Sequence, residues 1–150
     1  MRGIAHATIN LLDRLEKSKT FWYLLGVSLF FFLLRLPSLM EPYWYGDEGI
    51  YQIIGIALGK GELLYSDIWD NKPPFLYFVY AIFAGDQFSV RSFSLLVGIA
   101  TVIAFFFLSQ KIFTKRNISM LTTTVFAILF GMPLLEGNIA NAENFLLLPV

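Results

Sequence analysis

Apolar blocks of about the length of a bilayer crossing are the feature of this sequence that most restricts its fold. They cover residues 21–40, 88–110 and 118–135, and a further block begins at residue 145. An α-helix rises about 1.5 Å per residue, so about 20 residues cover the ~30 Å hydrocarbon core of a membrane. The blocks predict an all-α fold, a polytopic bundle of membrane helices in which residues 145–150 start a fourth span.

The composition agrees with this prediction and excludes several classes of protein. The chain of 150 residues is 57% apolar and 15% charged, whereas globular domains average about 45–50% and about 25%. A net charge of zero excludes a basic nucleic-acid binder and an acidic disordered tail, so we expect no nucleic-acid partner. The absence of cysteine excludes a disulfide scaffold and a cysteine-based zinc site.

One apolar run is too short to cross the membrane. As a helix, residues 75–84 would extend for about 15 Å, half of the hydrocarbon core. If this run crossed, the basic loop 111–117 would lie opposite the basic leader 1–20, but the positive-inside rule places both in the cytoplasm. We therefore expect this run to belong to a juxtamembrane helix in the outer interface.

The resulting topology alternates from the cytoplasm outward. Residues 1–20 and 111–117 are expected inside, and residues 41–87 and 136–144 outside. The inner part carries seven basic and two acidic residues, and the outer part, with the outer ends of the spans, four basic and nine acidic. The zero net charge is thus the cancellation of a basic inner face by an acidic outer face, and we expect a multi-pass protein with a cytoplasmic N-terminus.

The two ends of the chain carry separate expectations. The first block is interpreted as a retained signal anchor, because no small-x-small site follows it; a cleaved signal peptide is the alternative. The leader is expected to form a short interfacial helix, with a frayed tail as the alternative. Its face would consist of Ile4, Thr8, Leu11, Leu12 and Leu15. Six residues cannot span a bilayer, so the block at 145–150 indicates the N-terminal piece of a longer protein.

The outer segment 41–87 predicts two juxtamembrane helices, at about 48–59 and 73–84. The first has one apolar face at helical spacing and ends at a pair of glycines. That face comprises Ile50, Ile53, Ile54, Ala57 and Leu58. The second begins at Pro73-Pro74, since proline is tolerated in the first helical turn. Each helix has charged residues at its N-terminal end.

These charges and the aromatic residues around them are the candidate chemistry. A carboxylate beside the bilayer can act as a general base, and a nearby lysine or arginine can hold a phosphate leaving group. Aromatic rings suit sugars and prenyl chains: Tyr43, Trp44, Tyr45, Tyr51, Tyr65 and Trp69. Each feature also has a simpler explanation, because Asp47 can cap a helix, Lys72 can lie in water, and the aromatic residues can form an interfacial belt.

Four short motifs follow one another along the chain. They are Arg35-Leu36-Pro37, Gly46-Asp47-Glu48-Gly49-Ile50-Tyr51, Asp70-Asn71-Lys72-Pro73-Pro74-Phe75 and Arg91-Ser92-Phe93-Ser94-Leu95-Leu96-Val97-Gly98. In this order they resemble the N-terminal part of the polytopic glycosyltransferases of the GT-C fold. Over roughly residues 30–150 the chain is similar to the bacterial branch of aminoarabinose transferases and protein O-mannosyltransferases. The resemblance implies a bacterial plasma-membrane enzyme with two juxtamembrane helices in its first outer loop.

The resemblance also implies roles for individual residues. Asp47 matches the acidic residue taken as the catalytic base, and Glu48 is its partner. Lys72 matches the lysine associated with the lipid phosphate. Arg91 and Tyr51 fall within the matching motifs and are grouped with it as donor-binding candidates. Glu143 stands where the family has a further catalytic acid, but it is a glutamate and no arginine precedes it.

The sequence leaves open whether the candidate site binds a divalent cation. In some relatives the acidic residues ligate one, and Asp47, Glu48 and Glu143 could supply oxygen ligands. Asp47 and Glu143 are the candidate metal ligands. A set of carboxylates alone does not determine which metal ion would bind. The only histidine, His6, is expected on the other side of the membrane.

The function implied by the resemblance is transfer of a sugar from a polyprenyl-phosphate donor to a lipid, glycan or protein acceptor on the non-cytoplasmic face, with inversion. We expect residues 1–150 alone to be inactive, because most of the enclosing bundle would be missing. One alternative is a transporter or lipid-handling protein, in which Arg35 and Arg91 mark the path of an anionic headgroup. The other is a non-catalytic assembly subunit whose outer charges are merely solvated.

Overall fold

The computed structural model describes residues 18–42 and 45–148. Within these residues the chain is all-α, with six α-helices, two short 3₁₀ helices and no strand. The expected leader helix and His6 lie outside the described residues, as do Tyr43 and Trp44.

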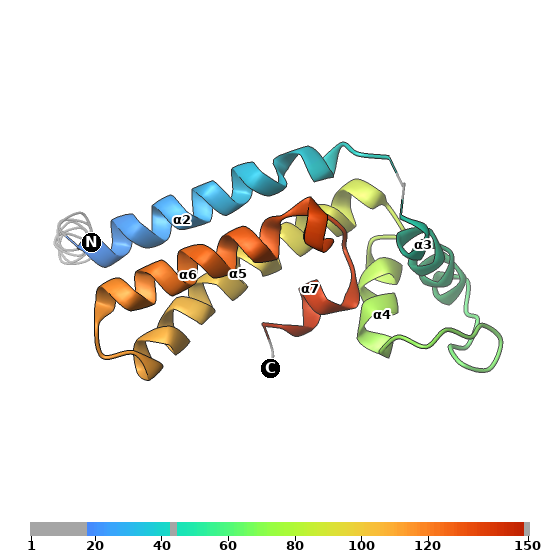
Figure 1. Cartoon of the computed structure of the whole chain (residues 1–150). Coiled ribbons are helices and arrows are strands. Elements are labelled where there is room, and N and C mark those ends of the chain that lie inside the picture. Colours follow the sequence, from blue (N-terminus) through green and yellow to red (C-terminus); the bar gives the residue numbers. More distant parts are fainter. Residues whose placement is uncertain (1–17, 43–44, 149–150) are drawn as a thin grey trace, which may run out of the picture.

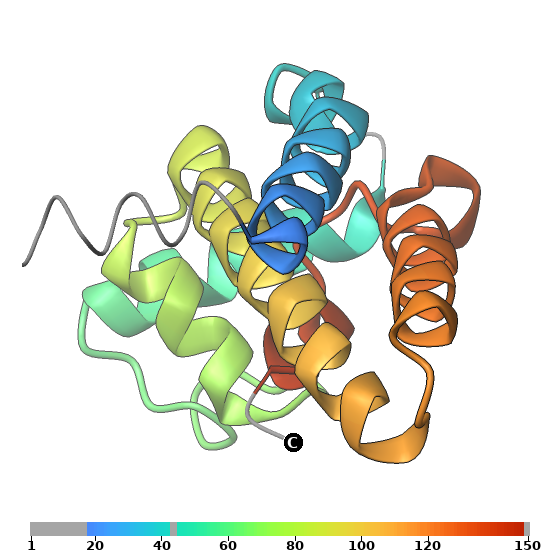
Figure 2. The same cartoon turned by 90° about the vertical axis from the view of Figure 1, so that its left-hand side faces the viewer.

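Three long helices lie side by side and form one part of the molecule (Figures 1 and 2). They are α2 (Lys19–Arg35), α5 (Gln87–Ile112) and α6 (Arg116–Gly131). Their shared core contains Val27, Phe31, Leu95, Val102 and Ala127. The fully buried Phe31 ring stacks on Phe130 with centroids 5.7 Å apart and lies against Gly98, whose missing side chain leaves room for it.

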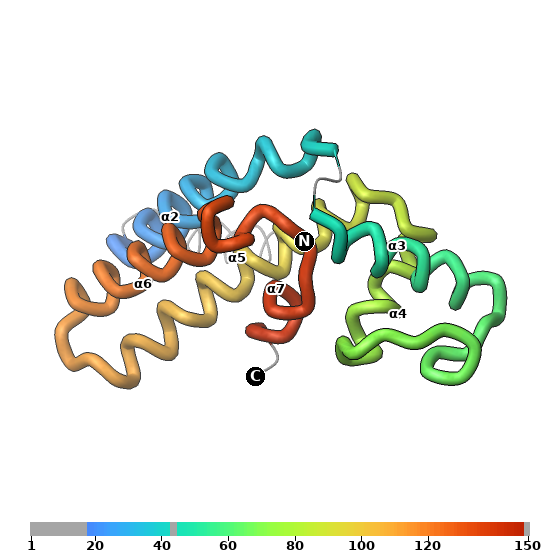
Figure 3. Tube along the Cα trace, turned by 45° about the vertical axis from the view of Figure 1, so that its right-hand side comes forward, coloured from blue at the N-terminus to red at the C-terminus, as the bar shows by residue number. Residues whose placement is uncertain are grey.

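Two shorter helices pack against each other at the other end of the molecule (Figures 1 and 3). Helix α3 covers Gly46–Gly59 and α4 covers Pro74–Ile82, where the sequence predicts helices at about 48–59 and 73–84. Their apolar faces meet in a second core that also takes in the start of α5 and part of α7. Its buried members are Tyr51, Ile54, Leu76, Tyr77, Val79, Tyr80, Val90, Ala140, Ala142 and Phe145.

The last described part of the chain turns back rather than running on as a long helix. Helix α6 has 16 residues and ends at Gly131, short of the expected limit at residue 135. Pro133 explains this, because a proline forces the preceding Met132 into its extended conformation. The 3₁₀ helix η2 (Pro133–Leu135) and the short α7 (Ala142–Leu146) follow. Helix α7 ends at Leu146, and a turn occupies 147–148.

Two of the helices pass a length and composition test for membrane spans. They are Lys19–Leu39, which joins α2 to the 3₁₀ helix η1 (Leu36–Leu39), and α5. This test is weak evidence for a membrane, since buried helices of soluble proteins and signal sequences also pass it. The large apolar side chains exposed on α2 are consistent with a membrane span, because a patch of this kind marks a surface that contacts lipid or another protein. They include Trp22, Leu25, Leu29, Phe30 and Leu33.

The contact between α3 and α4 depends on a glycine and yields a first prediction. A Cβ atom at Gly55 would lie 2.6 Å from the Cβ of Tyr80 and 2.8 Å from its carbonyl carbon, whereas one at Gly49 in the same helix meets nothing within 4 Å. We expect Gly55→Ala to lower the free energy of unfolding by about 1–3 kcal/mol, because backbone must shift. Gly49→Ala should be neutral or stabilising, by up to about 1 kcal/mol.

Thermal unfolding of the two purified variants in one detergent measures this difference. Equal midpoints for Gly55→Ala and Gly49→Ala would contradict the close approach of the two helices.

Candidate functional site

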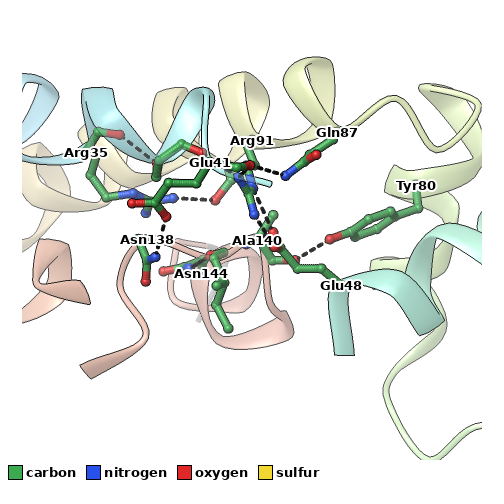
Figure 4. A network of polar contacts seen from close by, with 12 residues as sticks. Arg35, Glu41, Glu48, Tyr80, Gln87, Arg91, Asn138, Ala140 and Asn144 are labelled. Atoms are coloured by element: carbon green, nitrogen blue, oxygen red, sulfur yellow. Dashed lines mark hydrogen bonds and ion pairs between the residues drawn. The ribbon is translucent and has the colours of Figure 1, made fainter. Parts of the chain in front are cut away.

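A buried ion pair joins the first turn of α3 to the N-terminal part of α5 (Figure 4). The guanidinium of Arg91 donates from Nε to Oε1 of Glu48 over 3.1 Å and from Nη2 to Oε2 over 2.5 Å. Both side chains are 1% exposed. Such a two-pronged contact satisfies both carboxylate oxygens at once, which is the geometry in which a buried pair repays its desolvation.

The pair also holds backbone from two other segments. Nη1 of Arg91 donates to the carbonyl oxygens of Ser38 and Glu41, each over 2.6 Å. On the other side, the backbone N–H of Ala140 donates to Oε1 of Glu48 over 2.9 Å. The segment from η1 to Glu41 and the loop before α7 are therefore both held by this one pair.

Further hydrogen bonds surround the pair (Figure 4). The Gln87 side chain donates to the carbonyl oxygen of Glu41 over 2.6 Å, and Asn138 donates to the Glu41 carboxylate over 2.9 Å. The hydroxyl of Tyr80, on α4, donates to the carbonyl oxygen of Ala140 over 2.9 Å. These bonds join the segments around the N-terminal end of α5 into one network.

Arg35 is a second fully buried guanidinium beside this network. Its Nη2 donates to the Ser94 hydroxyl over 3.3 Å, and its guanidinium carbon lies 5.9 Å from the centre of the Phe31 ring. Its Nε and Nη1 make no hydrogen bond with the described residues. Arg35 thus helps join α2 to α5.

A pocket of about 260 Å³ opens between α3 and the segment before α4. Asp47, Tyr51, Asp70 and Lys72 line it together with Ile50 and Asn71. Three of the predicted site residues, Asp47, Tyr51 and Lys72, therefore meet in one place.

Tyr51 orients the carboxylate of Asp47. The buried tyrosine lies one helical turn after Asp47 and donates its hydroxyl to Oδ2 over 3.2 Å. Burial, together with the neighbouring Asp47 carboxylate, raises the pKa of Tyr51 well above its usual value. Its hydroxyl consequently stays protonated and keeps donating to Asp47, while Asp47 itself is half-buried and faces the pocket.

The backbone of Lys72 is held by two tyrosines. Its N–H donates to the Tyr77 hydroxyl over 3.1 Å, and its carbonyl accepts from Tyr65 over 2.7 Å. Tyr77 in turn donates to Oδ2 of Asp70 over 2.7 Å, and burial, reinforced by that hydrogen bond, raises the pKa of Tyr77. The lysine side chain remains 30% exposed.

Glu143 forms a long ion pair with Lys72. Its Oε1 is 3.8 Å from the Lys72 ammonium nitrogen, and the Glu143 side chain is 64% exposed. It also lines a second hollow of about 290 Å³ with Glu136, Asn141 and Asn144. Asn141 caps the short α7 by accepting from the N–H of Asn144 over 3.1 Å, which places Glu143 in the first turn.

The predicted site residues therefore separate into two groups. Asp47, Tyr51 and Lys72 line the open pocket and Glu143 pairs with Lys72, whereas Glu48 and Arg91 are buried against each other. Asp47 and Glu48 differ because successive helical residues point about 100° apart, so one faces the pocket when the other faces the core. We assign Glu48 and Arg91 a positioning role.

The candidate metal ligands do not form a metal site within the described residues. No group of three or more His, Cys, Asp or Glu side chains there could hold an ion. Glu143 instead pairs with Lys72.

Some contributors were not predicted. Asp70 was not among the predicted site residues, although its place two residues before Lys72 in the same motif was a usable signal. Tyr77 carried no signal beyond its apolar helical face. The Ala140 N–H could not have been found, because it acts through the backbone.

Comparison with known proteins adds no further evidence: no family model, curated protein or solved structure matches the chain.

The buried pair yields a second prediction. Replacing Glu48 by glutamine keeps the shape but leaves the Arg91 charge buried without its carboxylate. We expect Glu48→Gln to lower the free energy of unfolding by about 3–5 kcal/mol, as for other broken buried pairs. The exposed Glu62, changed to glutamine, is the matched control and should alter stability by less than about 0.5 kcal/mol.

Chemical unfolding of both variants measures the two effects. The double variant Glu48→Met with Arg91→Met should recover part of the loss, because no unpaired charge remains. Equal stability of Glu48→Gln and Glu62→Gln would contradict the role of the pair.

Proposed function

We propose that this chain is part of a multi-pass membrane glycosyltransferase that moves a sugar from a polyprenyl-phosphate donor to a nucleophilic acceptor on the non-cytoplasmic face. The observation that carries the proposal is the open pocket in which an oriented carboxylate, Asp47, and a partly exposed cation, Lys72, lie together. The motif order described above supplies the reaction class.

Asp47 is the general base in this proposal. A base has to be ionised, reachable and held in a fixed direction. Asp47 is half-buried, lines the pocket and accepts a hydrogen bond from the Tyr51 hydroxyl on one oxygen, which leaves the other oxygen for the acceptor. It takes the proton from the acceptor hydroxyl or amine as that atom attacks the anomeric carbon.

Lys72 stabilises the leaving group. As the bond from the acceptor to the anomeric carbon forms, the bond from that carbon to the phosphate oxygen breaks, and the electron pair stays on the phosphate. An ammonium beside that oxygen favours the developing charge. A single displacement of this kind inverts the configuration at the anomeric carbon.

The membrane part of the proposal places the pocket beside the outer surface. Both candidate spans approach the buried Glu48–Arg91 network with one end, α2 through η1 and α5 through its first turns. The pocket belongs to α3 and the segment before α4, which connect these spans in the sequence. A donor with its prenyl chain in the bilayer could thus present its phosphate to Lys72.

Substitution of Asp47 tests the proposed base. In the protein as its host cell makes it, Asp47→Asn should reduce sugar transfer by about 100-fold or more, since general-base catalysis contributes about 10²–10⁴. The measurement is release of prenyl phosphate from a labelled panel of prenyl-phosphate hexoses and pentoses, in native membranes. This readout requires no knowledge of the acceptor.

Glu62→Gln is the control, because it removes an exposed carboxylate just after α3, and it should retain full activity. Unchanged turnover by Asp47→Asn would reject Asp47 as the base. Transport of a prenyl phosphate with no sugar release from any donor would favour the lipid-handling alternative.

A further inference from the structure

We infer that Glu143 is a displaceable counter-ion of Lys72. Its carboxylate pairs with the Lys72 ammonium until the phosphate of an anionic prenyl ligand takes its place. The inference rests on the proposed function, because it assigns Lys72 to the phosphate. It gives Glu143 a positioning role in place of the catalytic role that the family resemblance implies.

The first support is the contrast between the two ends of Lys72. The backbone is fixed by the hydroxyls of Tyr65 and Tyr77, at 2.7 Å and 3.1 Å. Within residues 18–42 and 45–148, the one interaction of the ammonium is a long ion pair with Glu143. The lysine is therefore positioned at its base while its charged end can change partner.

The second support is how weakly Glu143 is held. The 3.8 Å separation of its Oε1 from the lysine nitrogen exceeds the length of a hydrogen bond, and its side chain is 64% exposed. Exposed ion pairs of this kind contribute little, because water and salt screen them. The carboxylate can rotate into solvent, or into the hollow beside Glu136, when a stronger anion arrives.

The third support is the charge around the lysine. Among the residues that line the two adjoining hollows, Lys72 is the one cation, and the acidic residues are Asp47, Asp70, Glu136 and Glu143. A phosphate entering this region meets net negative charge. Three of the four carboxylates accept a hydrogen bond from a tyrosine: Asp47 from Tyr51, Asp70 from Tyr77 and Glu136 from Tyr45. The fourth, Glu143, is the carboxylate paired with the lysine, so it is the one that an entering phosphate would displace.

Binding of farnesyl phosphate by the purified protein in detergent tests the inference. We expect Glu143→Gln to tighten binding about two- to fivefold, in line with the loss of one weak competing pair. Glu136→Gln removes a neighbouring charge that is not paired with Lys72 and should change binding less than twofold. Lys72→Gln should weaken binding, and Lys72→Gln combined with Glu143→Gln should show no tightening relative to Lys72→Gln alone.

The outcomes separate the inference from the proposed function. Equal effects of Glu143→Gln and Glu136→Gln, weaker or unchanged binding by Glu143→Gln, or no binding by the unmodified protein would overturn the counter-ion role. A loss of turnover by Glu143→Gln with unchanged binding would show a catalytic role instead. Lysine-dependent binding with the expected variant effects, but no sugar release from any donor, would support the counter-ion and reject the transferase.

Discussion

The buried pair of Glu48 and Arg91 is the interaction on which the rest of this structure depends. It joins α3 to α5 directly, and the two side chains also hydrogen-bond to the backbone of Ser38, Glu41 and Ala140. Four segments that are distant in the sequence therefore meet at one point. Because α3 is anchored by Glu48, the preceding residue, Asp47, is held at a defined place above the pocket.

This arrangement has an energetic cost that explains its detail. Two charges removed from water are favourable only when their geometry is good and their other donors and acceptors are satisfied. Arg91 and Glu48 meet these conditions. Nearby Arg35 meets these conditions less fully, since Nη2 is the one guanidinium nitrogen with a hydrogen-bond partner among the described residues. The other contact of this guanidinium is with the Phe31 ring. The pair, rather than Arg35, is thus the element that organises the site.

Much of the fold could be predicted from the sequence, because it follows from local rules. Apolar periodicity and the glycines at 59 and 61 indicated α3, and Pro73-Pro74 indicated the start of α4. The end of α6 was misplaced because the apolar block continues through Pro133, whose backbone constraint outweighs hydropathy. The site was predicted in part. The motif grouped Asp47 with Glu48, but the exposure of Asp47 to the pocket and the burial of Glu48 depend on which face of α3 packs against α5. The backbone donor Ala140 and the pairing of Glu143 with Lys72 arise only from tertiary structure.

The central claim is that the carboxylate of Asp47 performs the chemistry. The chain contains no cysteine, so Asp47→Cys introduces a single thiol into it. Treatment with iodoacetate then restores a carboxylate at this position, and treatment with iodoacetamide attaches a neutral group of similar size. We predict that Asp47→Cys is inactive in prenyl-phosphate release, that iodoacetate restores measurable activity, and that iodoacetamide does not, with the equally treated parent protein as control. Equal activity after the two treatments would contradict the account.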